Sequence, residues 1–390
     1  MRLQGEDWKD ETNMRFLAAF LLLFRLWPVQ ELHASAGEEQ KYIDQWLSSL
    51  EIENLDQDIR ELLPEMHIDA EALFMMILEG KVLTAVGELA SQLKGCFVSE
   101  IAGMRQVFLS ILVLGVLSAL FSGFSDLFAG QQMVEAGFYF LYLFLIVLLT
   151  RVFMTVSEIA TQAVENIILF VRLLIPTYFV AVGTACGTTT AAFYYEMMLV
   201  LSYLVERFLG AFLIPFIYSY VLLALLNGIW IEEKLTLLLD FMKKAIQMAL
   251  KISLGAVTGL SLVQAVIVPV ADQLKISAMR KALSALPGVG NLAEGVTELM
   301  IGSAVLIKNS MGVFLLLVLL AGSILPLLKI LLAAGAVKLG AAVAGIVSDK
   351  RLSGCTDRVG EGCLLLFRCV FTAMALFLIV IAVVAYMVSG

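Results

Sequence analysis

Residues 312–328 read GVFLLLVLLAGSILPLL, an apolar run without a charged side chain. A helix needs about 17–25 such residues to cross the hydrocarbon core of a bilayer. The rest of the chain has a similar character, because 61% of the 390 residues are hydrophobic and only 15% are charged. A soluble domain has roughly 45–50% apolar and about 25% charged residues. The composition therefore predicts an all-α fold, a polytopic membrane helix bundle.

The apolar windows along the chain predict about seven to nine spans in total. The window 190–205 is short, and 330–347 is so rich in alanine and glycine that it suits a packed or re-entrant helix. The predicted spans are 106–124, 137–157, 167–186, 190–205, 208–229, 252–271, 312–328, 330–347 and 369–388.

The first 36 residues have the pattern of a secretory signal peptide. Arg15 precedes the apolar run FLAAFLLLF at 16–24, and the triplet ASA at 34–36 has the A-x-A form of a cleavage site. The run is far shorter than the roughly 20 residues of a full span. We predict cleavage after Ala36, with an uncleaved anchor as the alternative. Acidic residues ahead of Met14 leave open whether translation starts there or at the first residue.

Residues 37–104 predict a small helical domain outside the cytoplasm, followed by a multispan domain over 105–390. In YIDQWLSSLEIENLDQDIRELL (42–63), apolar residues recur near helical spacing, and Pro64 ends the pattern. A second helix is expected after Asp69, and a third from Lys81 should run on into the membrane. Such helices suit a bundle that packs on itself or on the bilayer, or a surface for a partner.

Basic residues give a partial test of orientation. With the N-terminal domain outside, five crossings place the loop 230–251 in the cytoplasm, where its four lysines agree with the positive-inside rule. The next loop, 272–311, should then lie outside although it is also basic. A later cluster around Lys350 and Arg351 falls inside only if one of the two preceding segments does not cross. The topology of the second half stays open.

Four predicted spans contain two aliphatic residues followed by proline, at Pro176, Pro215, Pro269 and Pro326. Proline leaves a carbonyl one turn earlier without its helical partner and kinks the helix. Kinked helices can line a pathway, and they are also common in ordinary membrane packing. We predict a helix kink at each of the four.

The stretch VGTACGTTTAAFYYEMM (182–198) combines small and polar residues between two apolar runs. Gly183 and Gly187 form a small-xxx-small pair, as do Gly255 and Gly259, and such pairs let helix backbones approach closely. The stretch therefore predicts a tight turn or helix contact between the third and fourth spans. A broken helix that lines a polar cavity is the alternative.

Ionisable residues in the spans are candidates for that polar path. A charge inside the bilayer costs roughly 2.5–3.5 kcal/mol on insertion scales, so it normally faces protein or water. Arg172 and Glu196 flank the stretch from its two sides and are the predicted intramembrane pair. The candidate residues for the polar path are Arg172, Thr188, Thr189, Thr190 and Glu196.

The sequence offers no catalytic residues and no metal or cofactor site. The two histidines, His33 and His67, precede the spans, which removes an H-E-x-x-H zinc site. The aspartates after residue 105 are expected in loops, so no intramembrane aspartate dyad is visible, and no P-loop motif occurs. The five cysteines include no C-x-x-C pair, and a net charge of −8 argues against nucleic acid. We predict that the protein is not an enzyme.

Three motifs carry a resemblance to a known family: GTTTAAFYYE (187–196), FLGAFLIPFIYSYVLLALLNG (208–228) and LPGVGNLAEGVTELMIGSAVLIKNSMG (286–312). With them the chain resembles the stage III sporulation protein AE family of endospore-forming bacteria. The resemblance implies a multi-pass subunit in the mother-cell membrane that surrounds the forespore. It also implies a channel or feeding complex with several partners: other membrane and ring-forming subunits of the same sporulation operon, a secretion-type ATPase and the forespore's stage II sporulation protein Q. It supplies no catalytic residues.

Two functions follow from the residues and the resemblance together. The first is a membrane subunit that anchors, or forms part of, a transport complex between the two cells. The second is a self-contained secondary transporter, a permease that moves a small solute through its own midplane site. An intramembrane enzyme would need a catalytic pair that the sequence does not contain.

Overall fold

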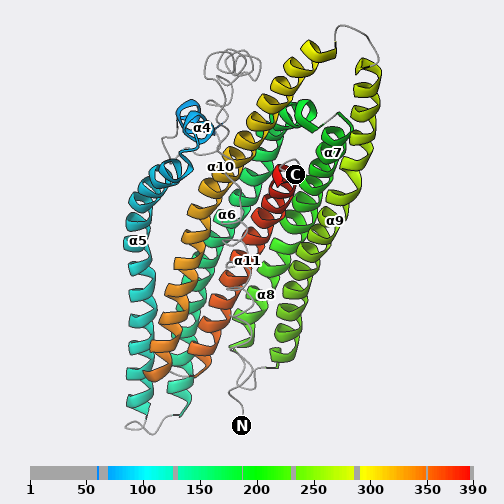
Figure 1. The fold of residues 1–390 in the computed structure, drawn as a ribbon. Coiled ribbons are helices and arrows are strands. Elements are labelled where there is room, and N and C mark those ends of the chain that lie inside the picture. Colours follow the sequence, from blue (N-terminus) through cyan, green and yellow to red (C-terminus); the bar gives the residue numbers. More distant parts are fainter. Residues whose placement is uncertain are drawn as a thin grey trace, which may run out of the picture.

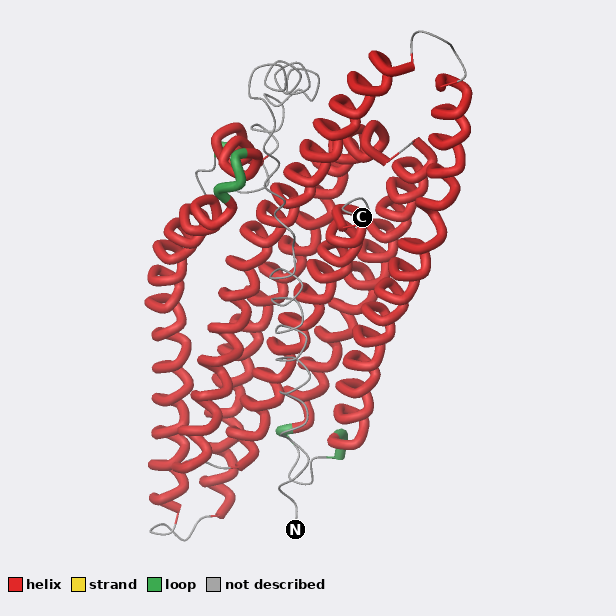
Figure 2. The backbone as a smooth tube through the Cα atoms, in the orientation of Figure 1, coloured by secondary structure: helices red, strands yellow, loops and turns green. Residues whose placement is uncertain are grey.

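The computed structural model describes residues 59–60, 69–125, 131–186, 188–229, 234–284, 290–347 and 350–386. Almost all of them are helical (Figure 2), and no described residue lies in a strand. The predicted all-α fold is therefore confirmed. The predicted signal peptide, Gly187 and nearly all of the first predicted helix lie outside the described residues.

The chain runs up and down a bundle of long helices (Figure 1). α7, the π-helical segment η1 and α8 follow one another without a break and act as one rod. The elements are α4 (Ala70–Leu78), α5 (Val82–Ser125), α6 (Gln131–Cys186), α7 (Thr188–Leu204), η1 (Val205–Leu213), α8 (Ile214–Asn227), α9 (Thr236–Ser284), α10 (Gly290–Val347) and α11 (Lys350–Tyr386).

The short helix α4 begins where the sequence predicts a second N-terminal helix. Asp69 caps it by accepting a hydrogen bond from the backbone N–H of Ala72 at 2.9 Å. Its apolar face is buried, and the Phe74 ring meets Phe314 of α10 edge-on, with 5.7 Å between ring centroids. Gly80, with φ of 77°, turns the chain into α5. Because α5 runs on without interruption, the predicted domain boundary at 104–105 falls inside it.

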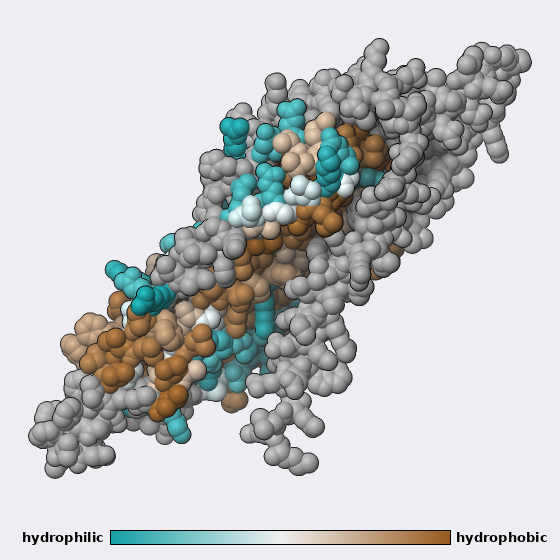
Figure 3. All heavy atoms as spheres, turned by 60° about the vertical axis from the view of Figure 1, so that its left-hand side comes forward, coloured by the Kyte–Doolittle hydropathy of each residue, from teal (hydrophilic) through white to brown (hydrophobic). Residues whose placement is uncertain are grey.

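α10 and α11 form the centre of the bundle. In their most apolar windows 72% and 67% of the residues are buried, whereas the corresponding figure for α9 is 17%. α10 packs against α5, α6 and α11, and α11 packs against α6, α8 and α9. Large apolar side chains stay exposed on the outer helices, which suits contact with lipid. Figure 3 shows one face of the molecule, where hydrophobic side chains run in a broad band along the bundle and hydrophilic ones gather in separate patches.

Five described helices are long and apolar enough to span a membrane, so the expected count of seven to nine spans is not confirmed. The candidate spans are Tyr139–Gly183, Ala191–Asn227, Thr236–Val263, Val305–Ile346 and Lys350–Ala385.

The predicted pairs of spans 137–157 and 167–186, 190–205 and 208–229, and 312–328 and 330–347 each lie in one continuous rod. The apolar stretches used to predict spans end at charged residues, for example at Glu206 and Arg207 or at Lys329. The helical backbone continues through these residues. The charges therefore divided the apolar pattern without dividing the helices.

The four prolines lie within the long rods. Pro176 is inside α6 and Pro326 is inside α10, and the helix assignment continues through both. Pro269 lies in α9, in a part where side chains are not described. Pro215 opens α8 directly after η1, where the backbone N–H of Ile214 donates to the carbonyl of Leu209, five residues earlier. The wider π turn thus directly precedes Pro215, which has no backbone N–H to donate.

Candidate functional site

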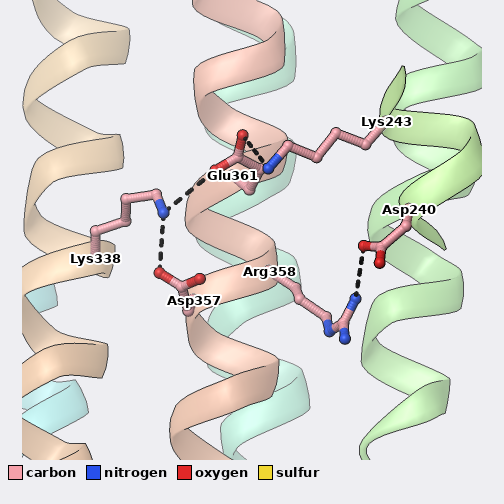
Figure 4. Close-up of polar contacts among 6 residues, drawn as sticks. All are labelled: Asp240, Lys243, Lys338, Asp357, Arg358 and Glu361. Atoms are coloured by element: carbon pink, nitrogen blue, oxygen red, sulfur yellow. Dashed lines mark hydrogen bonds and ion pairs between the residues drawn. The ribbon is translucent and has the colours of Figure 1, made fainter. Parts of the chain in front are cut away.

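Six charged side chains from three helices meet near the end of the bundle that holds the α8–α9 and α10–α11 connections (Figure 4). We call them the charge cluster. All six lie within candidate membrane spans. They are Asp240 and Lys243 of α9, Lys338 of α10, and Asp357, Arg358 and Glu361 of α11.

Glu361 is the centre of the charge cluster because it accepts from lysines on two different helices. Its Oε1 lies 2.8 Å from Nζ of Lys243, and its Oε2 lies 3.3 Å from Nζ of Lys338. Asp357 stands one helical turn earlier on the same face of α11, and its Oδ1 accepts from Lys338 at 2.9 Å. The Glu361 side chain is only 13% exposed. One carboxylate thereby ties α9 and α10 to α11.

The side chain of Arg358 points away from Lys338 and toward the beginning of α9 (Figure 4). Its Nη1 forms an ion pair with Oδ1 of Asp240 at 3.9 Å, and its Nη2 donates to Oγ1 of Thr236 at 3.4 Å. Thr236 is also contacted by the side chain of the buried Asn227, whose Oδ1 accepts from the backbone N–H of Leu235 at 2.8 Å. Asn227 therefore links the end of α8 to the start of α9, next to the Arg358–Thr236 hydrogen bond.

A glycine gives Lys338 the room to reach α11. A Cβ added to Gly360 would lie 2.6 Å from Cγ of Lys338, closer than real Cβ contacts allow. The stem of Lys338 thus crosses α11 directly over Gly360, between the carboxylates of Asp357 and Glu361.

The charge cluster is balanced, with three basic side chains and three carboxylates. Each member faces a counter-charge on a neighbouring helix, so none has to be accommodated alone in an apolar surrounding. Removing Lys243 or Lys338 would take one of two counter-charges from the largely buried Glu361, which costs more than losing a surface ion pair. The cluster therefore stabilises one particular arrangement of α9, α10 and α11.

A second internal cation fastens α10 to α11 at the opposite end of their contact. Lys308 is fully buried, and its Nζ donates to the backbone carbonyl of Ala385 at 3.2 Å. Ala385 lies one residue before the end of α11, where the free carbonyls give the helix its negative pole. One turn further along α10, Gly312 lets the backbone come close to Ala385 and to the Tyr178 hydroxyl of α6.

The structure replaces the predicted Arg172–Glu196 pair by a different one. Nη2 of Arg172 donates to Oε2 of Glu206 at 3.0 Å, and both side chains are about half exposed. α6 and α7 pack side by side and reverse direction at residue 187, so residues at similar distances from the turn meet. Arg172 lies 15 residues before position 187 and Glu196 only 9 after it, which at about 1.5 Å per residue leaves the two about 9 Å apart along the axis.

The remaining predicted polar residues are placed only in part. Thr188, Thr189 and Thr190 form the first turn of α7, directly after the reversal, and their side chains are not described. Glu196 is exposed on α7, and the described part of the chain gives it no ion-pair partner. α6 ends at Cys186 and α7 begins at Thr188, which agrees with the predicted tight turn. Whether a polar path passes here remains a hypothesis.

Of the glycines predicted for helix packing, Gly183 has a close neighbour, because a Cβ there would lie 3.4 Å from the Cβ of Ala191 on α7. Gly255 and Gly259 are exposed on α9, with nothing within 4 Å of an added Cβ. Within the part of the chain that the structure describes, neither glycine therefore serves a helix contact. The closest described glycine contacts on the long helices involve Gly115, Gly312, Gly340, Gly360 and Gly362.

Most of the charge cluster was missed by sequence reasoning. Lys338 lies within the predicted span 330–347, but Asp240 and Asp357, like the other aspartates after residue 105, were expected in loops and instead lie in α9 and α11. The signal that could have pointed to α11 is the i,i+4 pair of Asp357 and Glu361 beside Arg358. Nothing in the sequence indicates which basic residue of another helix lies opposite. Among the described residues no group of three potential ligands could hold a metal ion.

Comparison with known proteins gives two matches. A family model described as stage III sporulation protein AE matches residues 68–388. The chain is also similar to stage III sporulation protein AE of Bacillus subtilis (strain 168), with 20% identity over 276 residues, covering 70% of this chain and 69% of the relative. No solved structure matches the chain.

The long apolar helices and the internal charges that join them define the class of this protein as a helical membrane protein. The match over residues 68–388 goes further, because it spans most of the chain. The chain belongs to the stage III sporulation protein AE family, which gives it a role connected with sporulation.

Proposed function

We propose that the protein is a membrane subunit of the channel or feeding complex between mother cell and forespore, where it anchors or forms part of the transport path. It would reside in the mother-cell membrane that surrounds the forespore. Its partners would be the other membrane and ring-forming subunits of its operon, the secretion-type ATPase and the forespore's stage II sporulation protein Q. The role is one of assembly and transport rather than catalysis.

Family membership over residues 68–388 is the observation that carries this proposal. Two features of the fold support it. The candidate spans make a multi-pass location natural, and the charge cluster holds three of them in one arrangement, as a subunit that presents fixed surfaces to partners requires. The permease alternative has no specific observation in its favour, since the internal charges are paired with one another.

Affinity purification from sporulating cells tests the proposal. The full-length tagged protein is solubilised from membranes in mild detergent, and the proteins that accompany it are identified by mass spectrometry. We expect recovery of the other products of the operon and of the forespore protein. A tagged membrane protein of another function, expressed at the same stage, is the control.

The opposite result would be a stable monomer or homodimer that carries none of those proteins, although the same extract contains them. That result would contradict a subunit role. Solute uptake by liposomes containing the purified protein would then become the decisive assay for a permease.

A further inference from the structure

α6 carries four charged side chains at regular seven-residue spacing: Arg151, Glu158, Glu165 and Arg172. Seven residues are nearly two turns of an α-helix, so the four lie along one face. All four are exposed, as is Gln162 between the two glutamates. We call these five residues the α6 charged stripe. It differs from the charge cluster, whose members face one another inside the bundle.

The α6 charged stripe lies in the middle of the longest candidate span, Tyr139–Gly183. A bilayer core takes up about 20 residues of a helix. Every stretch of 20 residues within Tyr139–Gly183 contains at least two of the four charges, because they are spaced evenly from 151 to 172. No placement of α6 across a bilayer therefore exposes only apolar side chains. Lipid is a poor cover for ionised groups, so protein or water must cover this face.

The rest of the described chain does not provide that cover. Arg172 is engaged by Glu206, but no described residue forms an ion pair with Arg151, Glu158 or Glu165. The stripe opens into a groove of about 350 Å³ between α6 and Tyr218 of α8, lined also by Glu158, Thr161, Gln162 and Glu165. The groove is lined by polar and apolar surface in similar measure and carries two negative charges, and its size suits one or two long side chains.

We propose that the α6 charged stripe is the docking face for a membrane-spanning helix of another subunit, which inserts two basic side chains about seven residues apart opposite Glu158 and Glu165. The matching spacing follows from two helices packed side by side, since residues one heptad apart stay on the shared face. The basic side chains would occupy the groove beside Tyr218 and would neutralise the two carboxylates.

A second copy of this chain does not fit the same face. Two copies in one membrane have the same orientation, so a symmetric pair is related by an axis along the membrane normal. Their α6 helices would then run parallel, with Glu158 opposite Glu158 and Arg151 opposite Arg151. In such a symmetric pair like charges would face each other, and the proposal accordingly takes a different protein as the partner. The inference rests on the proposed function in this respect, because it takes that partner from the same membrane complex.

Site-specific photocrosslinking in sporulating cells tests the inference. A benzophenone amino acid replaces Gln162 in the full-length protein, and the crosslinked peptide is sequenced by mass spectrometry. Ile252, exposed and apolar within the candidate span of another helix, α9, is the control position. We expect a crosslink from position 162 to a membrane helix that carries Lys or Arg residues about one heptad apart, and no crosslink from position 252 to that helix.

Charge reversal provides the second arm. Glu158→Lys with Glu165→Lys should lower the yield of the crosslink at least 10-fold, and replacing the two basic partner residues by glutamate should restore at least half of it. Glu158→Gln with Glu165→Gln should give an intermediate yield. Abundance in the membrane and elution on gel filtration show whether each variant is folded, and the exposed positions make folding defects in the glutamine variant unexpected.

Three results would overturn the inference: a crosslink to a second copy of this chain, a crosslink to a protein without basic residues in the contacting helix, or no protein crosslink at position 162. Each remains separable from the proposed function. If affinity purification still recovers the operon products while position 162 contacts no protein, the docking face is wrong and the subunit role stands. If purification recovers none of the operon products, that result contradicts the proposed subunit role itself.

Discussion

Gly360 and Gly362 lie on different faces of α11 and let two sets of neighbours come close at once. Gly360 receives the stem of Lys338 from α10, and Gly362 receives Val221 of α8 and Phe153 of α6. A larger side chain at either position would have to displace an atom that is already packed. These glycines, rather than the exposed pair on α9, are where small size matters within the chain.

Gly360→Ala and Gly255→Ala should change stability in opposite directions. Alanine is a better helix former than glycine by about 1 kcal/mol, and nothing lies near an added Cβ at Gly255, so that variant should gain about 0.5–1 kcal/mol. At Gly360 the new methyl meets Lys338, whose far end is held by two carboxylates, and overpacking, which costs about 1–3 kcal/mol, should outweigh the gain. Thermal unfolding of the purified proteins in detergent measures both. Equal gains in the two variants would contradict the packing at Gly360.

At the scale of elements, α9 is the helix whose position depends most on a few polar contacts. Few residues of its apolar window are buried, and most of its large apolar side chains face outward. Two ion pairs, Lys243–Glu361 and Asp240–Arg358, set the register of α9 against α11. The hydrogen bond from the backbone N–H of Leu235 to Asn227 fixes the start of α9. α10 and α11, in contrast, share a broad buried interface that includes Lys308 at its far end.

Lys243→Met should destabilise the protein, whereas Lys244→Met should have little effect. Loss of Lys243 removes a counter-charge from the largely buried Glu361, which keeps only Lys338, so we expect a loss of about 1–3 kcal/mol. Lys244 is exposed on the same helix, and its replacement should stay within about 0.5 kcal/mol. Thermal unfolding in detergent, with Lys243→Arg as the variant that retains the charge, distinguishes the two. Indistinguishable melting of all three variants would refute the role of the pair in holding α9.

At the scale of the whole molecule, the bundle is much longer than a bilayer is thick. α6 has 56 residues and is about 84 Å long at about 1.5 Å per residue, against a hydrocarbon core of about 30 Å. Parts of the rods must therefore lie outside the core or against other proteins. The fold also places both basic clusters, around Lys234 and around Lys350, at the same end, because α10 is one helix where two spans were expected.

We expect that end to face the cytoplasm. Seven basic residues lie near the α8–α9 and α10–α11 connections, against three, Lys275, Arg280 and Lys281, near the opposite α9–α10 connection. The seven are Lys234, Lys243, Lys244, Lys338, Lys350, Arg351 and Arg358.

Labelling of single cysteines with a membrane-impermeant maleimide tests this orientation. In non-sporulating cells that express the protein in their outer cell membrane, Lys234→Cys and Lys350→Cys should react only after cells are opened, and Ser284→Cys should react in intact cells, with the unsubstituted protein as the background. Labelling of positions 234 and 350 from opposite sides would contradict the continuous α10.

The sequence alone determined the helical membrane class, because composition and apolar runs depend only on which side chains are present. It also located the start of α4 at its capping residue and the reversal near position 187, which are local signals. The family could be recognised from motifs, and the match over residues 68–388 confirms it.

The pairing of charges was decided only by the tertiary structure. Arg172 meets Glu206 in place of Glu196, and Lys338 meets Asp357 and Glu361, because such contacts depend on which helices are neighbours and on their relative heights. The number of continuous helices could not be predicted from the sequence either. A charged residue such as Lys329 ends an apolar window whether or not the helix ends there. Hydropathy measures the preference of each residue for lipid, whereas a charge inside a bundle is stabilised by a partner that the chain brings from far away.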